Sequence, residues 1–534
     1  MSEAEKKQNF LHGAALLAMA TAIVKIIGAL YKIPLKMIIG DQGFGYFNTA
    51  YEIYSVLLMI STAGLPIAMS RMISQASSLD HYKQVRKVYK TARAIFLGLG
   101  VLSSGLMLIF CKELAQFQRQ PNAMVAILCL SPCALLMGIM STFRGFFQGQ
   151  GNMRPTSVSQ VLEAVFKLIV GLALAYLLMK RTNSVAMAAG GAILGVTTSC
   201  LVSVVYLYGK FRPAYKSLPQ TAEETDSYKR AAKGLLAIAV PITIGSAGLQ
   251  LLTVLETNLY MGQLLTANGF SQDTADTMKG IYNMAQTIFN MPCAFMIPIT
   301  TSILPAITAH LTLKNHQAVR DTEESAARIT GLLSLPCSVG LAVLARPVMS
   351  LLGGYSGEKL ELAATLMTIL AIGIFLYALV QYTNVVLQSH GRAGIPVANM
   401  LISGVVKLVV VYVLVGNPNI GIAGAPTGAI LCYLCIAVMN LIAIGKIVPE
   451  KPKLLKNILR PVLPVGIMGL AVWGSYRGLV SLLGQEGSRL LLCGVPVVVG
   501  VAIYGVCIVR FKAITREDCL LLPKGEKIAQ LLHL

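Results

Sequence analysis

The sequence predicts an all-α, polytopic membrane protein: about 14 transmembrane helices, arranged as two parallel-repeat six-helix lobes plus two extra C-terminal helices. Three observations support this fold. The 534 residues are 55% hydrophobic and only 13% charged, and the mean hydropathy is +0.69, too apolar for a chain that exposes its surface to water. Apolar runs of roughly 20 residues recur along the whole length, as bilayer-spanning helices require. A segment of the first half also recurs in the second half.

The predicted spans follow one another with short polar connectors. Their length favours helices over the shorter, alternating strands of a membrane barrel. The spans are residues 11–33, 46–73, 91–111, 122–147, 157–179, 186–208, 234–264, 281–310, 328–352, 362–388, 396–415, 422–445, 459–482 and 489–510.

The net charge of +21 is concentrated in the connectors after even-numbered spans. Acidic residues such as Asp41, Glu113 and Asp273 lie in the opposite connectors. The positive-inside rule then predicts a membrane protein with residues 1–10 and 511–534 in the cytoplasm. This distribution argues against nucleic acid as a partner. The basic residues are Lys83, Arg86, Lys87, Lys90 and Arg93; Lys210, Arg212, Lys216, Lys229, Arg230 and Lys233; and Lys446, Lys451, Lys453, Lys456 and Arg460.

An internal repeat defines the predicted domains. Gln148 and Lys167 match Gln388 and Lys407 at one offset, since 388 − 148 = 240 and 407 − 167 = 240. Six spans return the chain to the same side, so the two copies are predicted to be parallel and to enclose a central cavity. The predicted segments are an N-lobe at 11–208, a cytoplasmic linker at 209–233, a C-lobe at 234–445 and the two additional spans within 446–510.

Three lysines lie near the middle of predicted spans. Lys25, Lys167 and Lys407 occupy depths where a cation costs several kcal/mol, so such residues normally face a hydrated cavity or a partner. In the first span Lys25, Lys32 and Lys36 are spaced by seven and four residues, which predicts a basic stripe on one helix face. This stripe suits an anionic ligand. Lys36 is expected to reach the outer headgroups, whereas Lys25 is too deep to do so.

Acidic residues near these lysines leave two interpretations open. Glu163 precedes Lys167 by four residues, the spacing of a helical ion pair, which would be either a neutralised structural pair or part of a ligand site. Lys407 has Ser403 at the same offset and is therefore the better ligand candidate. Glu52 and Glu256 are candidate counter-ions, or proton or sodium sites.

Arg144 is the last candidate substrate contact, at the predicted cytoplasmic end of the fourth span. The alternative is that it only anchors this end through the positive-inside effect. We expect no metal site, no cofactor and no enzymatic activity. Cys432 and Cys435 have metal-ligand spacing but lie in an apolar run without nearby His or acid, and the six histidines have no ligand spacing.

Several motifs resemble those of a known family. They are Val24-Lys25-Ile-Ile-Gly28-Ala-Leu-Tyr31-Lys32-Ile-Pro34, Gly40-Asp-Gln-Gly43-Phe-Gly45-Tyr46, Ser61-Thr-Ala-Gly64-Leu-Pro66, the prolines Pro292, Pro298 and Pro305, and the tail from Arg516 to Lys527. Over essentially the whole chain the sequence resembles polysaccharide-biosynthesis membrane proteins. These include stage V sporulation protein B and the lipid II flippases, within the multidrug/oligosaccharidyl-lipid/polysaccharide exporter superfamily.

The resemblance implies two six-helix lobes, alternating access and export of undecaprenyl-pyrophosphate-linked saccharides. It places Lys25 where lipid II flippases carry a cavity arginine in the first helix. A second family arginine is replaced here by Tyr31, with Lys32 beside it. The implied location is a bacterial plasma membrane, and the implied partners are a lipid-linked oligosaccharide, membrane lipids and cell-wall synthesis enzymes.

Three functional hypotheses follow. The favoured one is a flippase that carries lipid II, or a related cell-wall or spore-cortex precursor, from the inner to the outer leaflet. The second is a proton- or sodium-coupled exporter of small organic cations, although the deep residues are mostly basic. The third is a non-transporting membrane scaffold for wall synthesis.

Overall fold

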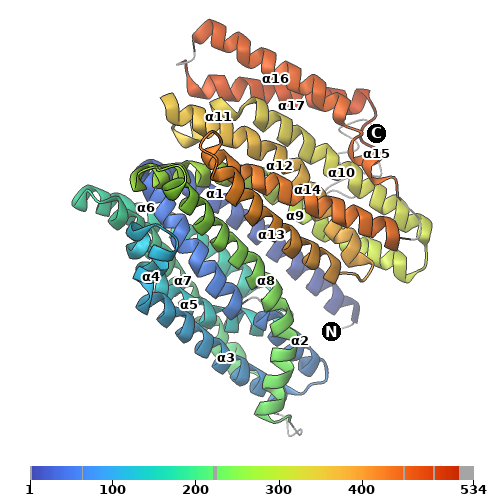
Figure 1. Ribbon diagram of the computed structural model, residues 1–534. Coiled ribbons are helices and arrows are strands. Elements are labelled where there is room, and N and C mark those ends of the chain that lie inside the picture. The colour runs from blue at the N-terminus through green and yellow to red at the C-terminus, as the bar shows by residue number, and fades with distance from the viewer. Residues whose placement is uncertain (1–2, 63, 221–224, 449–451, 485–486, 516–534) are drawn as a thin grey trace. The chain divides into compact units, whose positions relative to one another are not determined.

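Every regular element in the described part of the chain is a helix (Figure 1). The computed structural model describes residues 3–62, 64–220, 225–448, 452–484 and 487–515. Part of the predicted linker and the predicted tail beyond residue 515 lie outside these ranges. The prediction of an all-α, multi-pass membrane protein is confirmed, because 12 helices of the described residues are long and apolar enough to cross a bilayer.

The predicted number of spans stays a prediction. One of the 12 candidates, Ile23–Ser78, begins within the first predicted span and includes all of the second. The predicted eighth span falls in α9 (Gln272–Thr312), where several side chains, including those of Pro298 and Pro305, lie outside the described set.

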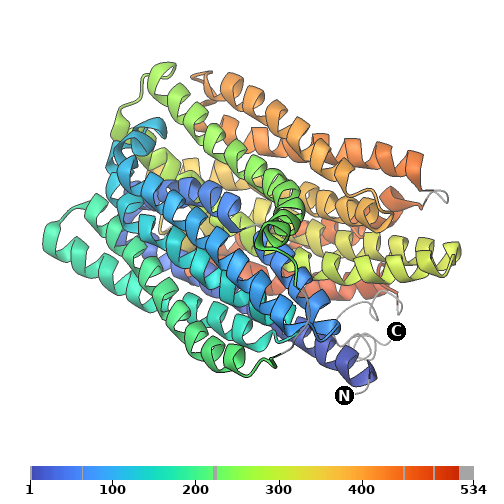
Figure 2. The same cartoon turned by 90° about the horizontal axis from the view of Figure 1, so that it is seen from below.

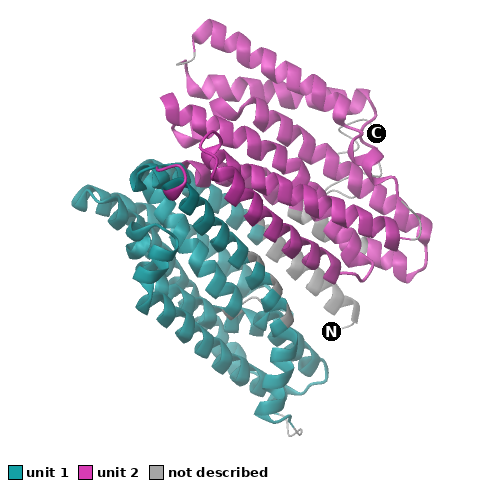
Figure 3. Ribbon diagram, in the orientation of Figure 1, with its two compact units in different colours: residues 1–265, 270–280 teal, residues 266–269, 281–534 magenta. Residues whose placement is uncertain are grey.

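The helices group into two compact units, each described here by itself (Figure 3). Unit 1 comprises residues 1–265 and 270–280, and unit 2 comprises residues 266–269 and 281–534. Unit 1 contains α1 (Glu3–Thr62), α2 (Leu65–Ser78), α3 (Tyr82–Ile109), α4 (Cys111–Phe117), η1 (Pro121–Ala123), α5 (Met124–Gly149), α6 (Arg154–Thr182), α7 (Val185–Lys216), nearly all of α8 (Tyr228–Thr266) and the start of α9. The predicted lobe boundaries stay a prediction.

Unit 2 contains the remainder of α9 and the C-terminal helices. These are α10 (His316–Val343), α11 (Ala345–Gly353), α12 (Gly357–Ser389), α13 (Gly394–Val415), η2 (Gly421–Ala423), α14 (Gly424–Ile447), α15 (Leu454–Ile458), α16 (Val462–Leu483) and α17 (Arg489–Arg510). Within each unit the long helices lie side by side (Figures 1 and 2). In unit 2, α12 packs on α10 and α14, and α16 packs on α17 and α10.

Gly40 divides α1 into two helices. Its φ of 69° and ψ of −174° are not helical, and glycine tolerates this conformation because it has no Cβ. Lys32 Nζ lies 3.4 Å from Asn48 Oδ1, although sixteen residues of straight helix would span about 24 Å. The chain therefore reverses at Gly40, and the two arms of α1 face each other.

Small residues allow α6 and α7 to pack with their backbones in contact. A Cβ on Gly195 would overlap the backbone of Gly171, so neither helix tolerates a larger side chain at this crossing. Close approach of this kind is the usual means by which membrane helices associate, because lipid supplies no hydrophobic force between them.

The internal repeat is visible in the turns that follow α5 and α12. Gly151 and Gly391 have φ angles of 74° and 75°, and their offset is 391 − 151 = 240. Each donates its backbone N–H over 3.0 Å to the carbonyl of Gln148 or Gln388, respectively. Equivalent residues thus form equivalent turns, each with a glycine where a positive φ is required.

Candidate functional site

The reversal of α1 places Lys32 inside unit 1. Its ammonium contacts the Asn48 side chain and lies 6.0 Å from the centre of the Phe44 ring. Lys167 of α6 acts on it as a nearby like charge. Lys32 therefore points toward neighbouring helices of its own unit.

Lys167 is held by aromatic rings. Its ammonium lies 5.2 Å from the centre of the Tyr31 ring and 4.8 Å from that of Tyr51. Both distances are within the range of cation–π attraction, which offsets part of the loss of hydration. Tyr31 is buried and donates its hydroxyl to the Ala192 carbonyl over 3.3 Å, which fixes one of the two rings.

The structure gives Glu163 a partner other than the expected one. Its carboxylate lies 3.1 Å from Arg144 Nη2, and Arg144 Nε also donates to Ser159 Oγ over 3.0 Å. The Glu163–Lys167 ion pair expected from helical spacing is wrong, because Arg144 of α5 donates Nη2 to the carboxylate instead. Lys167 retains only a longer-range interaction with Glu163.

The basic stripe expected on the first span is divided by the fold. Lys36 is buried and pairs with Asp41 over 3.3 Å across the kink, so the expectation that it reaches the headgroups is wrong. Lys25 is exposed on unit 1, whereas Lys32 is half-buried. All three lysines precede Gly40, and the arm after the kink supplies Asn48 to Lys32 and Asp41 to Lys36.

Glu52 lies in a buried polar network that the sequence did not predict. Its carboxylate is 3.5 Å from the ammonium of Lys279, whose side chain has 0% exposure. Lys279 also donates to Thr49, and Thr49 donates to Gln120. The network thus joins α1, the start of α9 and the connector between α4 and η1.

Asp276 completes this network. Its carboxylate accepts hydrogen bonds from Tyr46 at 3.0 Å, from Gln120 at 2.8 Å and from Gln272 at 2.9 Å. Three donors to one buried carboxylate compensate much of its desolvation. Sequence analysis missed Asp276 and Lys279, because both stand near the start of a predicted span, where a charged side chain ordinarily reaches water or headgroups.

Glu256 of α8 is buried near the same network. It acts electrostatically on Glu52, and the neighbouring Thr257 gives Glu52 a hydrogen bond. A Cβ on Gly280 would overlap the Asp41 carbonyl, so the start of α9 packs directly on α1. Two carboxylates and Lys279 therefore share one buried region of unit 1.

Of the predicted site residues, unit 1 brings most together. A series of charged groups runs from Arg144 and Glu163 through Lys167 and Lys32 to Glu52, with Glu256 beside it. Lys407 is half-buried in α13 of unit 2. No group of three His, Cys, Asp or Glu side chains suitable for a metal occurs among the described residues.

Comparison with known proteins assigns the family. The sequence model described as "Polysaccharide biosynthesis protein" matches residues 10–310. The chain belongs to the polysaccharide biosynthesis protein family. A second model, described as MatE, matches residues 278–413 of this family member.

Relatives of this polysaccharide biosynthesis family member include three proteins of Bacillus subtilis strain 168. The chain is 26% identical to the membrane protein YabM, over 99% of this chain and 97% of the relative. It is 25% identical to stage V sporulation protein B, over 97% and 98%. It is also 25% identical to the lipid II flippase MurJ, over 87% and 88%.

Solved structures show the fold of this family member. An inward closed structure of the lipid II flippase MurJ matches with a TM-score of 0.67 and 13% identity, covering 95% of this chain and 100% of that chain. An inward-facing multidrug resistance MATE transporter of the MOP superfamily matches with a TM-score of 0.67 and 15% identity, covering 80% and 98%. The chain thus has the fold of MOP-superfamily transporters.

Proposed function

We propose that the protein is a flippase that moves an undecaprenyl-pyrophosphate-linked saccharide from the inner to the outer leaflet by alternating access. The observation that carries this proposal is the position of Lys32 and Lys167. Their two ammonium groups lie near each other and contact rings and an amide, and the described residues give neither a carboxylate partner at ion-pair distance. Two neighbouring cations without a local counter-ion form a receptive site for an anion of two or more charges.

The surrounding charges support an anionic cargo. Glu52 and Glu163, the acids that act on these lysines, are each paired with another cation, Lys279 and Arg144 respectively. A pyrophosphate would therefore complete the charge balance of Lys32 and Lys167. Lys25 and Lys407 are proposed to contact the same headgroup at other stages of transport, as expected from their depth.

The membrane potential supplies a driving force for this direction of transport. With the predicted orientation, both termini are cytoplasmic and the inside is negative. Each negative charge moved outward across 100 mV gains about 2.3 kcal/mol. A pyrophosphate headgroup could therefore move outward without nucleotide hydrolysis.

Complementation tests the proposal. Lys32→Met, Lys167→Met and the double variant are expressed in a bacterium depleted of its lipid II flippase, beside a Lys456→Met control at an exposed position in unit 2. We expect loss of growth with the double variant and accumulation of the lipid-linked intermediate in the inner leaflet. Full rescue by the double variant, at equal expression, would refute the site.

The second candidate is an exporter of small organic cations coupled to protons or sodium. It is favoured by the buried Glu256 and by the fold shared with MATE transporters. Loss of dye efflux on Glu256→Gln, with growth complementation retained, would favour this candidate. The scaffold hypothesis predicts instead that the Lys32/Lys167 double variant still supports growth.

A further inference from the structure

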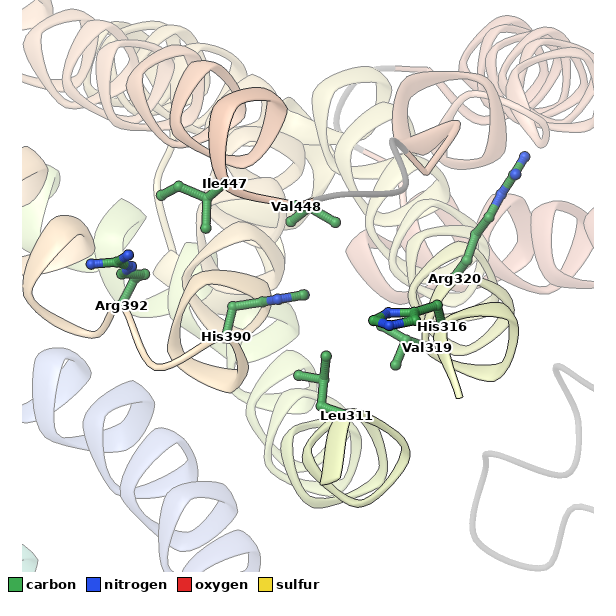
Figure 4. Close-up of a pocket in the computed structure, with 8 residues that line it drawn as sticks. All are labelled: Leu311, His316, Val319, Arg320, His390, Arg392, Ile447 and Val448. Atoms are coloured by element: carbon green, nitrogen blue, oxygen red, sulfur yellow. The ribbon is translucent and has the colours of Figure 1, made fainter. Parts of the chain in front are cut away.

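A cavity lies in unit 2, among the ends of four helices (Figure 4). It has a volume of about 220 Å³, room for roughly seven waters at about 30 Å³ each. Its walls come from the ends of α9, α10 and α14 and from the turn after α12. With the predicted orientation these ends lie at the cytoplasmic surface.

Basic and apolar side chains share the lining of this cavity equally. The lining residues are Leu311, His316, Val319, Arg320, His390, Arg392, Ile447 and Val448, with no acid among those described. His316 and His390 approach the space from opposite walls, and Arg320 and Arg392 stand at its rim with their guanidinium groups directed away from it (Figure 4). A basic rim can bind a phosphate, and an apolar wall can contact the lipid glycerol to which that phosphate is attached.

A buried carboxylate holds one wall in place. Glu323 has a side-chain exposure of 0%, and its Oε1 lies 2.9 Å from His390 Nε2. Tyr382, also buried, donates its hydroxyl to the Glu323 carbonyl over 2.8 Å. The Glu323 carboxylate of α10 therefore positions the His390 ring, and Tyr382 of α12 fixes the backbone of Glu323. The orientation of His390 toward the cavity does not depend on a ligand.

The remaining basic groups differ in their availability. Arg320 is paired with Glu324 over 3.2 Å, and Glu324 also accepts from Asn457 at 3.0 Å. Arg392 is exposed, and the described residues supply it with no ion pair. His316 is exposed at the first turn of α10, where backbone N–H groups favour an anion. Arg392 and His316 are thus the groups able to turn toward a ligand.

We propose that this cavity binds a phosphate-bearing anion, with the headgroup of an anionic phospholipid of the same leaflet as its source. Basic pockets between transmembrane helices on the cytoplasmic side are typical sites for such headgroups. Val319 and Val448 contact the apolar part, and Arg392 and His316 bind the phosphate. The site lies wholly in unit 2 and is separate from the Lys32 and Lys167 site of unit 1.

The experiment measures lipid retention by the purified full-length protein. Short-chain phosphatidylglycerol, short-chain phosphatidylcholine and inorganic phosphate are titrated separately, and bound lipid is counted by native mass spectrometry. The pocket variant is His316→Gln/Arg392→Gln. The matched control is Lys456→Gln/Arg460→Gln, which alters two exposed basic residues of the same unit outside the cavity.

We expect the pocket variant to bind phosphatidylglycerol about tenfold more weakly, the factor of one charge-assisted hydrogen bond, and the control to change less than twofold. Competition by inorganic phosphate would show that phosphate alone is recognised. Lack of competition, with phosphatidylglycerol bound about tenfold more tightly than phosphatidylcholine, would assign the lipid as the source. Equal binding of the two lipids, or equal loss in pocket variant and control, would overturn the proposal.

A single variant distinguishes loss of the site from misfolding. Arg392→Gln changes only an exposed side chain and should reproduce at least part of the loss, with an unchanged thermal midpoint. Unaltered binding in a folded Arg392→Gln protein, together with unaltered binding in the double variant, would also overturn the proposal.

Discussion

Removal of the Lys279 ammonium should destabilise unit 1 strongly. At 3.5 Å from Glu52 and an effective dielectric constant of about 20, the attraction is about 332/(20 × 3.5), or about 5 kcal/mol, before desolvation is subtracted. Breaking a buried pair from one side typically costs about 3–5 kcal/mol, because the other charge stays buried. We therefore expect Lys279→Met to lower the free energy of unfolding by about 3 kcal/mol.

A double-mutant cycle separates the pair from the general effect of each substitution. Unfolding is followed in mixed micelles with increasing sodium dodecyl sulfate for Lys279→Met, Glu52→Gln and the double variant. Because the double variant removes both charges of the pair, its loss should be smaller than the sum of the single losses by about 2 kcal/mol. Additive losses would show that the two side chains do not stabilise each other and would refute the pairing.

Three further predictions concern packing and pairing. Gly280→Ala should destabilise the protein by more than about 2 kcal/mol, because the added Cβ would overlap the backbone of α1. Gly209→Ala is the control: open space surrounds that glycine, so the change should be neutral or stabilising, and similar unfolding midpoints for both variants would contradict the close contact. Arg144→Ala should lower the free energy of unfolding by about 2–4 kcal/mol, because it leaves the Glu163 carboxylate unpaired. Adding Glu163→Gln should recover part of this loss in the same micelle titration, and no recovery would show that the ion pair is unimportant. Gly391→Ala should cost about 1 kcal/mol, because φ is 75° there, and an unchanged midpoint would argue against that turn.

Individual positions show how far the sequence could predict the site. Lys167 is singled out in the sequence by its depth in an apolar run, because a cation there needs compensation for its lost hydration, and its role in binding stays a prediction. Its compensation was predicted wrongly. Helical spacing offered Glu163, but the structure places Lys167 over Tyr31 and Tyr51, residues of another helix.

Lys279 was missed because nothing in its own segment marks it as buried. It stands near the start of a predicted span, where a lysine ordinarily reaches water or headgroups. Its burial follows from the contact of Gly280 with α1 and from the side chain of Glu52, 227 residues earlier by 279 − 52. Contacts between residues so far apart leave no local periodicity for sequence analysis to detect.

The sequence alone determined an α-helical membrane protein with lysines deep in its apolar runs, from the hydrophobic runs, the charge distribution and the offset of 240 residues. It could do so because a bilayer permits few ways to hydrogen-bond the backbone N–H and C=O groups. The tertiary structure alone decided which charges meet. Ion pairing depends on distances of a few ångströms between helices, and these are set by the reversal at Gly40 and by glycine contacts at crossings. Local sequence specifies each helix, whereas the partners of its charged side chains are specified by how the helices pack.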